Sequence, residues 1–82
     1  DEDGEIDDLF FQAAETVITT GQASASFLQR RMSVGYARAG RLMDQLQDQG
    51  VVSAPNNKNQ REVLMSAEEL QKLRAGEAGP VG

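Results

Sequence analysis

The chain has 82 residues, a formal net charge of −5, and neither cysteine nor histidine. These absences exclude a disulfide framework, a thiolate metal site and histidine-based chemistry, and no apolar run approaches the ~20 residues of a membrane-spanning helix. A chain of this length is expected to form one small domain.

Positive and negative charges are separated along the chain. Six of the thirteen acidic residues lie in the first eight positions, DEDGEIDD. Between Leu9 and Met65, six basic residues outnumber four acidic ones, and four of the six are arginines in RRMSVGYARAGR, residues 30–41. Because charge acts locally on partner choice, the basic centre predicts an acidic partner despite the negative total.

The chain is predicted to begin with an acidic linker that is followed directly by a helix. Residues 1–7 are expected to form a disordered linker, because like charges repel and bury no apolar surface. A helix is predicted over about residues 8–20, with Asp7 or Asp8 capping its first turn and Gly21 ending it. Its apolar residues recur at helical spacing: Leu9, Phe10, Ala13, Ala14, Val17 and Ile18.

Two further helices are predicted around a tight turn. Ser26 and Gln29 form a capping-box pattern, so a short second helix is expected to begin there and to end at the turn SVG, residues 33–35. A third helix is predicted over about residues 36–49, ending at Gly50. Its buried side would carry Ala39, Leu42, Met43 and Leu46, and its outer side Arg38, Arg41, Asp44, Gln45 and Asp48.

The last third of the chain changes period. VVSAP (51–55) and REVLM (61–65) are short β-prone segments around the polar turn NNKNQ, which predicts a hairpin. Ser66 followed by Glu69 favours a short C-terminal helix, and the rest of residues 66–82 is expected to be a frayed tail. The predicted fold class is therefore α+β: a winged helix-turn-helix domain over residues 8–65, with three helices and a β-hairpin wing.

This order of elements favours DNA binding. The helix after a tight turn enters the major groove in helix-turn-helix proteins, and Arg38 and Arg41 near its start suit guanine. Lys58 and Arg61 would meet phosphates from the hairpin. Two exposed arginines are also typical of an ordinary solvated face. Tyr36 either packs under the turn, which is favoured, or bonds a phosphate.

Three stretches carry a family resemblance: LQRR (28–31), VGYARAGRLMDQL (34–46) and REVL (61–64). With the residues between them they resemble the C-terminal γ domain of the FtsK/SpoIIIE family of bacterial DNA translocases over roughly residues 9–64. Family members are membrane-anchored hexameric motors that pump chromosomal DNA at the division septum.

The resemblance implies a function and partners. It implies a cytoplasmic winged-helix domain, without membrane contact of its own, that binds double-stranded DNA and recognises short, G-rich, strand-polarised motifs to orient the motor. Protein partners would be other subunits of the hexameric parent and, in some members, a Xer-type tyrosine recombinase. No cofactor or metal is implied.

The resemblance also implies which residues bind. Carried over by position, base contacts fall on Ala37, Arg38, Arg41 and Asp44, and Asp44 could accept from a cytosine amino group or orient Arg41. The family often has asparagine where Ala37 stands, so the preferred sequence is expected to differ at one position. Backbone contacts are expected from Gln29, Arg30, Arg31, Tyr36, Lys58 and Arg61.

Two other functions compete with this one. A winged-helix transcription regulator would need a dimerisation element, for which only SAEELQKL (66–73) is available. A protein-docking winged helix would be apolar or acidic where this chain carries arginines. The chain has no GxxxxGK[ST] phosphate loop, so it is expected to be a non-catalytic part of an ATP-driven parent.

Overall fold

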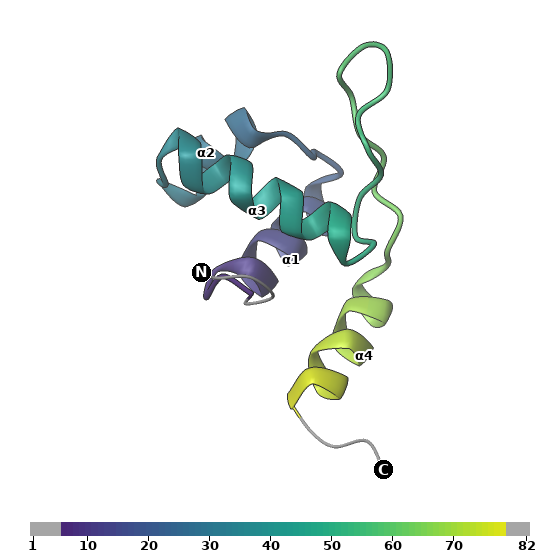
Figure 1. Cartoon of the computed structure of the whole chain (residues 1–82). Helices are drawn as coiled ribbons and strands as arrows, with labels where there is room; N and C mark the ends of the chain where they lie inside the picture. Colours follow the sequence, from purple (N-terminus) through teal and green to yellow (C-terminus); the bar gives the residue numbers. More distant parts are fainter. Residues whose placement is uncertain (1–5, 79–82) are drawn as a thin grey trace.

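Within residues 6–78, which the computed structural model describes, the chain forms four helices. They are α1 (Phe10–Thr20), α2 (Ala25–Met32), α3 (Tyr36–Asp48) and α4 (Ala67–Ala78). In Figure 1, α1, α2 and α3 gather into one body, the loop after α3 projects to the top, and α4 extends below. Residues 1–5 of the predicted linker 1–7, and the end of the predicted tail (79–82), lie outside the described residues.

The core lies where the first three helices meet. The predicted apolar side of the third helix is buried, as is that of the first except for Leu9 and Ile18, which are partly buried, and α2 adds Leu28. Val51, Val52 and Leu70 close the core from the segment after α3 and from α4. Burying these side chains removes apolar surface from water, which fixes how α3 is rotated in the fold. The buried helix residues are Phe10, Ala13, Ala14, Val17, Leu28, Ala39, Leu42, Met43 and Leu46.

Two helix ends confirm local predictions, and the start of α2 corrects one. Gly21 ends α1 in the left-handed conformation, with φ 76°. At the start of α4, the Glu69 N–H donates to Ser66 Oγ (3.1 Å), and the Ser66 N–H donates to Glu69 Oε1 (2.9 Å), which completes a capping box. However, α2 begins two residues earlier than predicted, because Ser24 and not Ser26 is its cap and accepts from the Phe27 N–H.

The turn predicted over residues 33–35 lies between α2 and α3. Ser33 takes the left-handed conformation, with φ 57° and ψ 46°, and ends α2. Gly35 is extended, with φ −75° and ψ 167°, and precedes α3 as its N-cap. The glycine is therefore not the residue that carries the strained backbone.

The predicted α+β winged-helix fold is wrong, because residues 6–78 contain no β-sheet and hence no hairpin wing. One isolated antiparallel bridge joins Val52 to Val63, and the described chain is otherwise helices and loops. The segment that was expected to form the wing is an irregular loop, residues 53–62, which stands out from the helical body (Figure 1).

Side chains explain why the ladder stops after one bridge. The Ser53 N–H still donates to the Glu62 carbonyl (2.9 Å), but the returning Glu62 N–H donates to Ser53 Oγ instead of a backbone oxygen. The Ser53 carbonyl accepts from Arg61 Nη1 (3.2 Å), and Pro55 has no N–H to donate. Side-chain hydrogen bonds thus replace the backbone pairs that a hairpin requires.

The described chain begins with two residues that lie against the helices. Ile6 is partly buried and packs on the core. The Leu9 N–H donates to Asp7 Oδ1 (2.8 Å), but Leu9 is itself the N-cap of α1 and no side chain caps this helix, so the predicted capping by Asp7 or Asp8 is wrong. Asp7 also contacts α3. The division into 1–7, 8–65 and 66–82 stays a prediction, although these two residues of its first segment belong to the packed body.

Candidate nucleic-acid interface

The outer side of α3 is exposed because its other side is anchored in the core. Ala39, Leu42 and Leu46 are fully buried, so residues between them on the helix turn toward solvent. Ala37, Arg38, Arg41 and Asp44, the four predicted base contacts, are all exposed. The arginines therefore point outward, as the helical spacing predicted.

An open hollow of about 530 Å³ lies between the start of α2, the outer side of α3 and the loop 53–62. Gly40 and Met43 of α3 and Asn59 of the loop complete its walls beside the small residues Ala23, Ser24 and Ala25. A second hollow, of about 470 Å³, shares four of these wall residues and continues along the loop. The first hollow brings together five residues predicted to contact DNA: Tyr36, Ala37, Arg41, Asp44 and Arg61.

Arg41 is the arginine of α3 that faces this hollow. Its side chain is exposed and makes no hydrogen bond or ion pair with any residue in the described range 6–78. Asp44 lies one turn further along the same side of the helix and also lines the hollow. The Arg41 guanidinium can donate two hydrogen bonds to a base edge, and the neighbouring Asp44 carboxylate can accept one from a base amino group.

Arg38 forms an ion pair with Asp7 and does not face the hollow. Its Nε donates to Asp7 Oδ2 (3.1 Å) and its Nη2 donates to Asp7 Oδ1 (2.7 Å), so the pair is bidentate. The Asp7 carboxylate is 8% exposed and the Arg38 side chain 46% exposed. Arg38 does not line the hollow, and its role in base contact stays a prediction.

The electrostatics of this pair follow from its geometry. The hydrogen bonds from Arg38 lower the pKa of the Asp7 carboxyl below its ordinary value, and partial burial opposes that shift less strongly. The same bonds raise the pKa of Arg38. The Asp7 N–H donates to Gln45 Oε1 (3.0 Å), so α3 holds both the backbone and the side chain of this residue.

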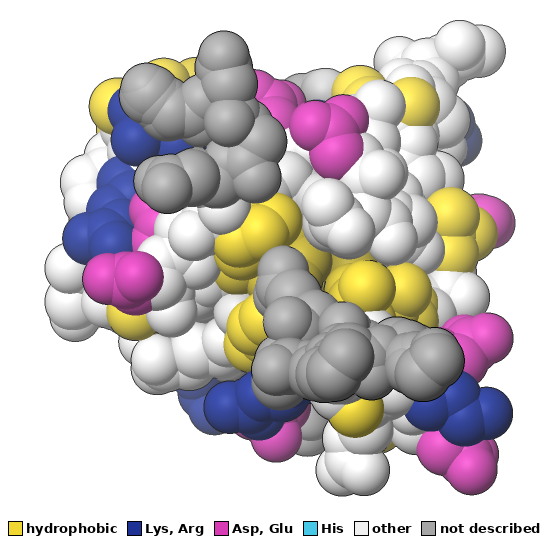
Figure 2. Space-filling view, turned by 60° about the horizontal axis from the view of Figure 1, so that its bottom comes forward, with side chains coloured by type: hydrophobic (Ala, Val, Ile, Leu, Met, Phe, Trp, Pro, Cys, Tyr) yellow, Lys and Arg dark blue, Asp and Glu magenta, His cyan; other side chains and the backbone are white. Residues whose placement is uncertain are grey.

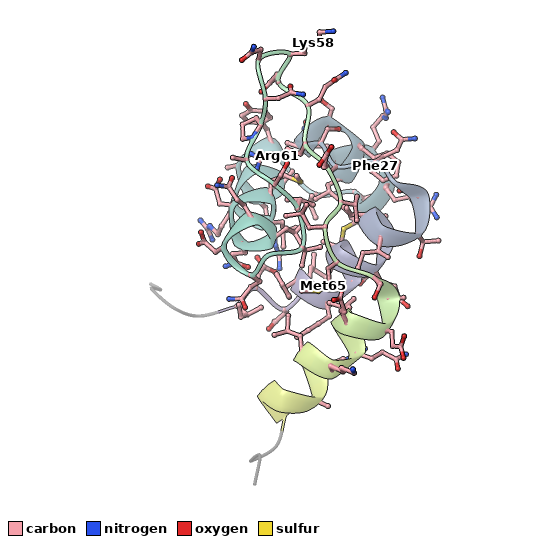
Figure 3. The ribbon with its side chains drawn as sticks, turned by 90° about the vertical axis from the view of Figure 1, so that its right-hand side faces the viewer. Phe27, Lys58, Arg61 and Met65 are labelled. Carbon is pink, nitrogen blue, oxygen red and sulfur yellow. The ribbon has the colours of Figure 1, made fainter. Side chains whose placement is uncertain are left out.

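The two basic residues of the loop 53–62 differ in how firmly they are held. Arg61 is partly buried, and its Nη1 donates to Gln47 Oε1 of α3 (2.7 Å) as well as to the Ser53 carbonyl. Lys58 lies at the tip of the loop and points away from the helices, whereas Arg61 lies near its base beside α3 (Figure 3). Arg61 is thus preorganised at the wall of the hollow, and Lys58 can reach beyond it.

The remaining predicted contacts fall into two groups. Gln29, Arg30 and Arg31 are not among the residues that line the hollow, and both arginines lie in the last turn of α2, where cations favour the helix dipole. Tyr36 is 73% exposed and lines the hollow, so the favoured interpretation, packing under the turn, is wrong. Its hydroxyl is available to a ligand.

The sequence analysis did not identify the partners that orient Arg38 and Arg61. Asp7 and Arg38 are 31 residues apart, and Arg61 and Gln47 are 14 apart, so no helical or strand spacing connects them. The residues at the start of α2 were missed because the predicted cap lay too late. Only the acidic character of residue 7 and the basic character of residue 38 could have suggested a pair.

The opposite side of the molecule is different in kind. Figure 2 shows apolar side chains gathered near the middle of the underside of Figure 1, with charged side chains around them. Separately, α1 and α4 enclose a small hollow of about 100 Å³ lined by Phe11, Ile18 and Leu70, and the Arg74 guanidinium lies 5.4 Å from the Phe11 ring centre. No residue predicted to contact DNA lines this hollow. Within residues 6–78, no helix has both the length and the apolar character needed to cross a membrane.

Comparison with known proteins gives one consistent match. Residues 4–66 match the model of the Ftsk gamma domain. The chain is 42% identical over 87% of its length to the DNA translocase FtsK of Caldanaerobacter subterraneus subsp. tengcongensis, and 54% identical over 74% to that of Pasteurella multocida. It is 45% identical over 98% of its length to the DNA translocase FtsK of Streptomyces avermitilis. The matched regions span only 10%, 6% and 9% of these relatives.

Proposed function

This chain belongs to the Ftsk gamma domain family, and from that premise we propose that it binds double-stranded DNA and reads short, G-rich, strand-polarised motifs. The observation that carries the proposal is the hollow between α2, α3 and the loop 53–62. There Arg41 and Asp44 of α3 are exposed beside a braced Arg61. Nothing in this proposal depends on a β-hairpin.

The residues of the hollow divide into reading and positioning roles. Arg41 forks to guanine O6 and N7, and Asp44 accepts from a neighbouring cytosine amino group or orients Arg41. Ala37 offers only a methyl group, which suits contact with a thymine methyl. Arg61, the Tyr36 hydroxyl and Lys58 contact phosphates, which set the register of the domain without reading sequence.

The electrostatics support a domain that binds weakly alone. Few basic residues are available for phosphate contact, so a single domain binds weakly, and because those contacts are ionic its binding weakens further as salt rises. Several copies, supplied by a hexameric parent, would bind tightly through avidity. In that setting the domain orients a membrane-anchored, ATP-driven DNA translocase at cell division and makes no catalytic contribution of its own. Contact with a Xer-type recombinase belongs to the same proposal and rests on the family resemblance.

The test is a comparison of duplexes with matched variants. Fluorescence anisotropy measures binding of the 82-residue chain to a G-rich duplex selected from a random pool and to its scrambled version. Arg41→Ala should cost about 1–3 kcal/mol on the selected duplex and flatten the preference at one base pair. Arg74→Ala removes the same charge from the α1–α4 side and should leave both affinities nearly unchanged.

Two results would contradict the proposal. Equal affinity of the wild-type chain for the selected and scrambled duplexes would show that the domain does not discriminate between DNA sequences. If Arg41→Ala folds normally and weakens every duplex equally, Arg41 is a phosphate contact and the assignment of the reading residue fails.

A further inference from the structure

The bidentate pair between Asp7 and Arg38 places a carboxylate on the helix that is proposed to read DNA. Both Asp7 oxygens accept from Arg38, and the carboxylate is almost entirely covered. The backbone of Asp7 is held separately, because its N–H donates to Gln45 Oε1 of the same helix. Asp7 is therefore fastened to α3 at two points, and its position does not depend on Arg38 alone.

Two adjoining stripes of α3 differ in what they face. Ala37, Arg41 and Asp44, each three or four positions from the next, form the stripe that borders the hollow, whereas Arg38 does not line it. Arg38 and Gln45 form the neighbouring stripe, which Asp7 covers. Two arginines one turn apart on the same helix thus have opposite surroundings: one is paired, and the other faces open space.

We propose that Asp7 is a specificity-determining residue, which holds Arg38 away from DNA phosphates and so restricts binding that is independent of sequence. The inference rests on the proposed function, because it concerns the same helix. It gives Arg38 a role different from the base contact that the sequence predicted.

The physical reason is the balance between phosphate contacts and base contacts. Phosphate contacts strengthen binding to every duplex alike, whereas discrimination comes from base edges. A second unpaired arginine beside Arg41 would raise the affinity for all DNA sequences. It would therefore lower the ratio of the affinity for the preferred duplex to the affinity for other duplexes. A covered carboxylate on Arg38 neutralises that charge while the guanidinium still braces the start of α3 against the chain before α1.

Asp7→Asn is the substitution that isolates this effect. The asparagine oxygen can still accept from the Leu9 N–H, and the backbone bond to Gln45 is untouched, so the local fold is kept. Asp8→Asn is the matched control, since it removes the same charge from an exposed neighbour that has no hydrogen bond to Arg38. Thermal unfolding of both variants confirms folding, and Asp7→Ser, whose hydroxyl can also accept from the Leu9 N–H, serves if Asp7→Asn does not fold.

The readouts are affinity for a scrambled duplex and for heparin across a salt series, neither of which requires sequence reading. Asp7→Asn should bind the scrambled duplex several-fold more tightly than Asp8→Asn does, and the slope of log affinity against log salt should steepen by about one contact, ~0.9. Adding Arg38→Gln to Asp7→Asn should abolish the gain. The preference for the selected duplex over the scrambled one should fall in Asp7→Asn.

Two outcomes overturn the inference. One is an equal effect of Asp7→Asn and Asp8→Asn on scrambled-duplex and heparin affinity, which would make Asp7 an ordinary surface charge. The other is a gain that survives Arg38→Gln, which would mean that a different cation was released. Failure of the proposed function is a separate result, namely a wild-type chain without any duplex preference.

Discussion

Replacing Gly40 by alanine should stabilise the domain, because the fold gains nothing from a glycine there. Gly40 lies in the interior of α3, and a Cβ built at this position meets no atom within 4 Å beyond its own helix. Its φ is not in the positive range that favours glycine. Alanine in a helix interior is favoured over glycine by about 0.8–1 kcal/mol, and with no clash to offset this, the whole gain should appear. For a domain of this size that corresponds to a rise in Tm of about 3–8 °C.

The assay is thermal unfolding followed by circular dichroism, with Gly21→Ala as the control. Gly21 also has no atom within 4 Å of a built Cβ, but its φ is +76°. The same added methyl group should therefore lower stability there by about 1–2 kcal/mol, the left-handed penalty for an L-residue. A Gly40→Ala variant with an unchanged or lower Tm would refute the reasoning, because it would mean that α3 needs the glycine for packing or that its backbone departs from the helix at that point.

Four other substitutions test separate parts of the structure. Ser33→Gly should raise the free energy of unfolding measured in urea by about 0.5–1 kcal/mol, because Ser33 holds a left-handed backbone (φ 57°). A fall would mean that its side chain matters more than its backbone. Leu46→Ala should destabilise by about 2–5 kcal/mol in chemical denaturation, because Leu46 is fully buried; a cost under about 1 kcal/mol would place it outside the core. Lys58→Ala should weaken binding to all duplexes alike and reduce the salt slope by about one, and a change confined to one sequence would contradict a phosphate role. The pKa of the Asp7 carboxyl is lowered by Arg38, so its stabilisation is full above the unfolded-state pKa of ~3.9 and is lost as pH falls through the lower folded-state pKa. The Tm difference between wild type and Asp7→Asn should therefore be constant from about pH 7 to 5 and shrink as the pH falls below ~3.9. A constant difference throughout would exclude the ion pair as its cause.

The sequence alone determined the helices and their inner sides. Apolar residues at helical spacing predicted which side of α3 is buried, and Ala39, Leu42, Met43 and Leu46 are all in the core. Local signals at helix ends worked where one residue decides the backbone, as Gly21 does. These predictions succeed because spacing along a helix fixes which residues share a side, whatever packs against it. The family also followed from the sequence, since the stretches that carry the resemblance lie within the matched residues 4–66.

The tertiary structure decided the features that depend on residues far apart in sequence. Whether two β-prone segments pair depends on which groups compete for their backbone N–H and C=O groups. Here the Ser53 hydroxyl accepts from the Glu62 N–H, and the Arg61 guanidinium donates to the Ser53 carbonyl, so no wing forms. Arg38 and Arg41 are indistinguishable in sequence, both outward and one turn apart. They are separated only because the core packs α1 against α3 and so brings Asp7, 31 residues away, into hydrogen-bonding contact with Arg38.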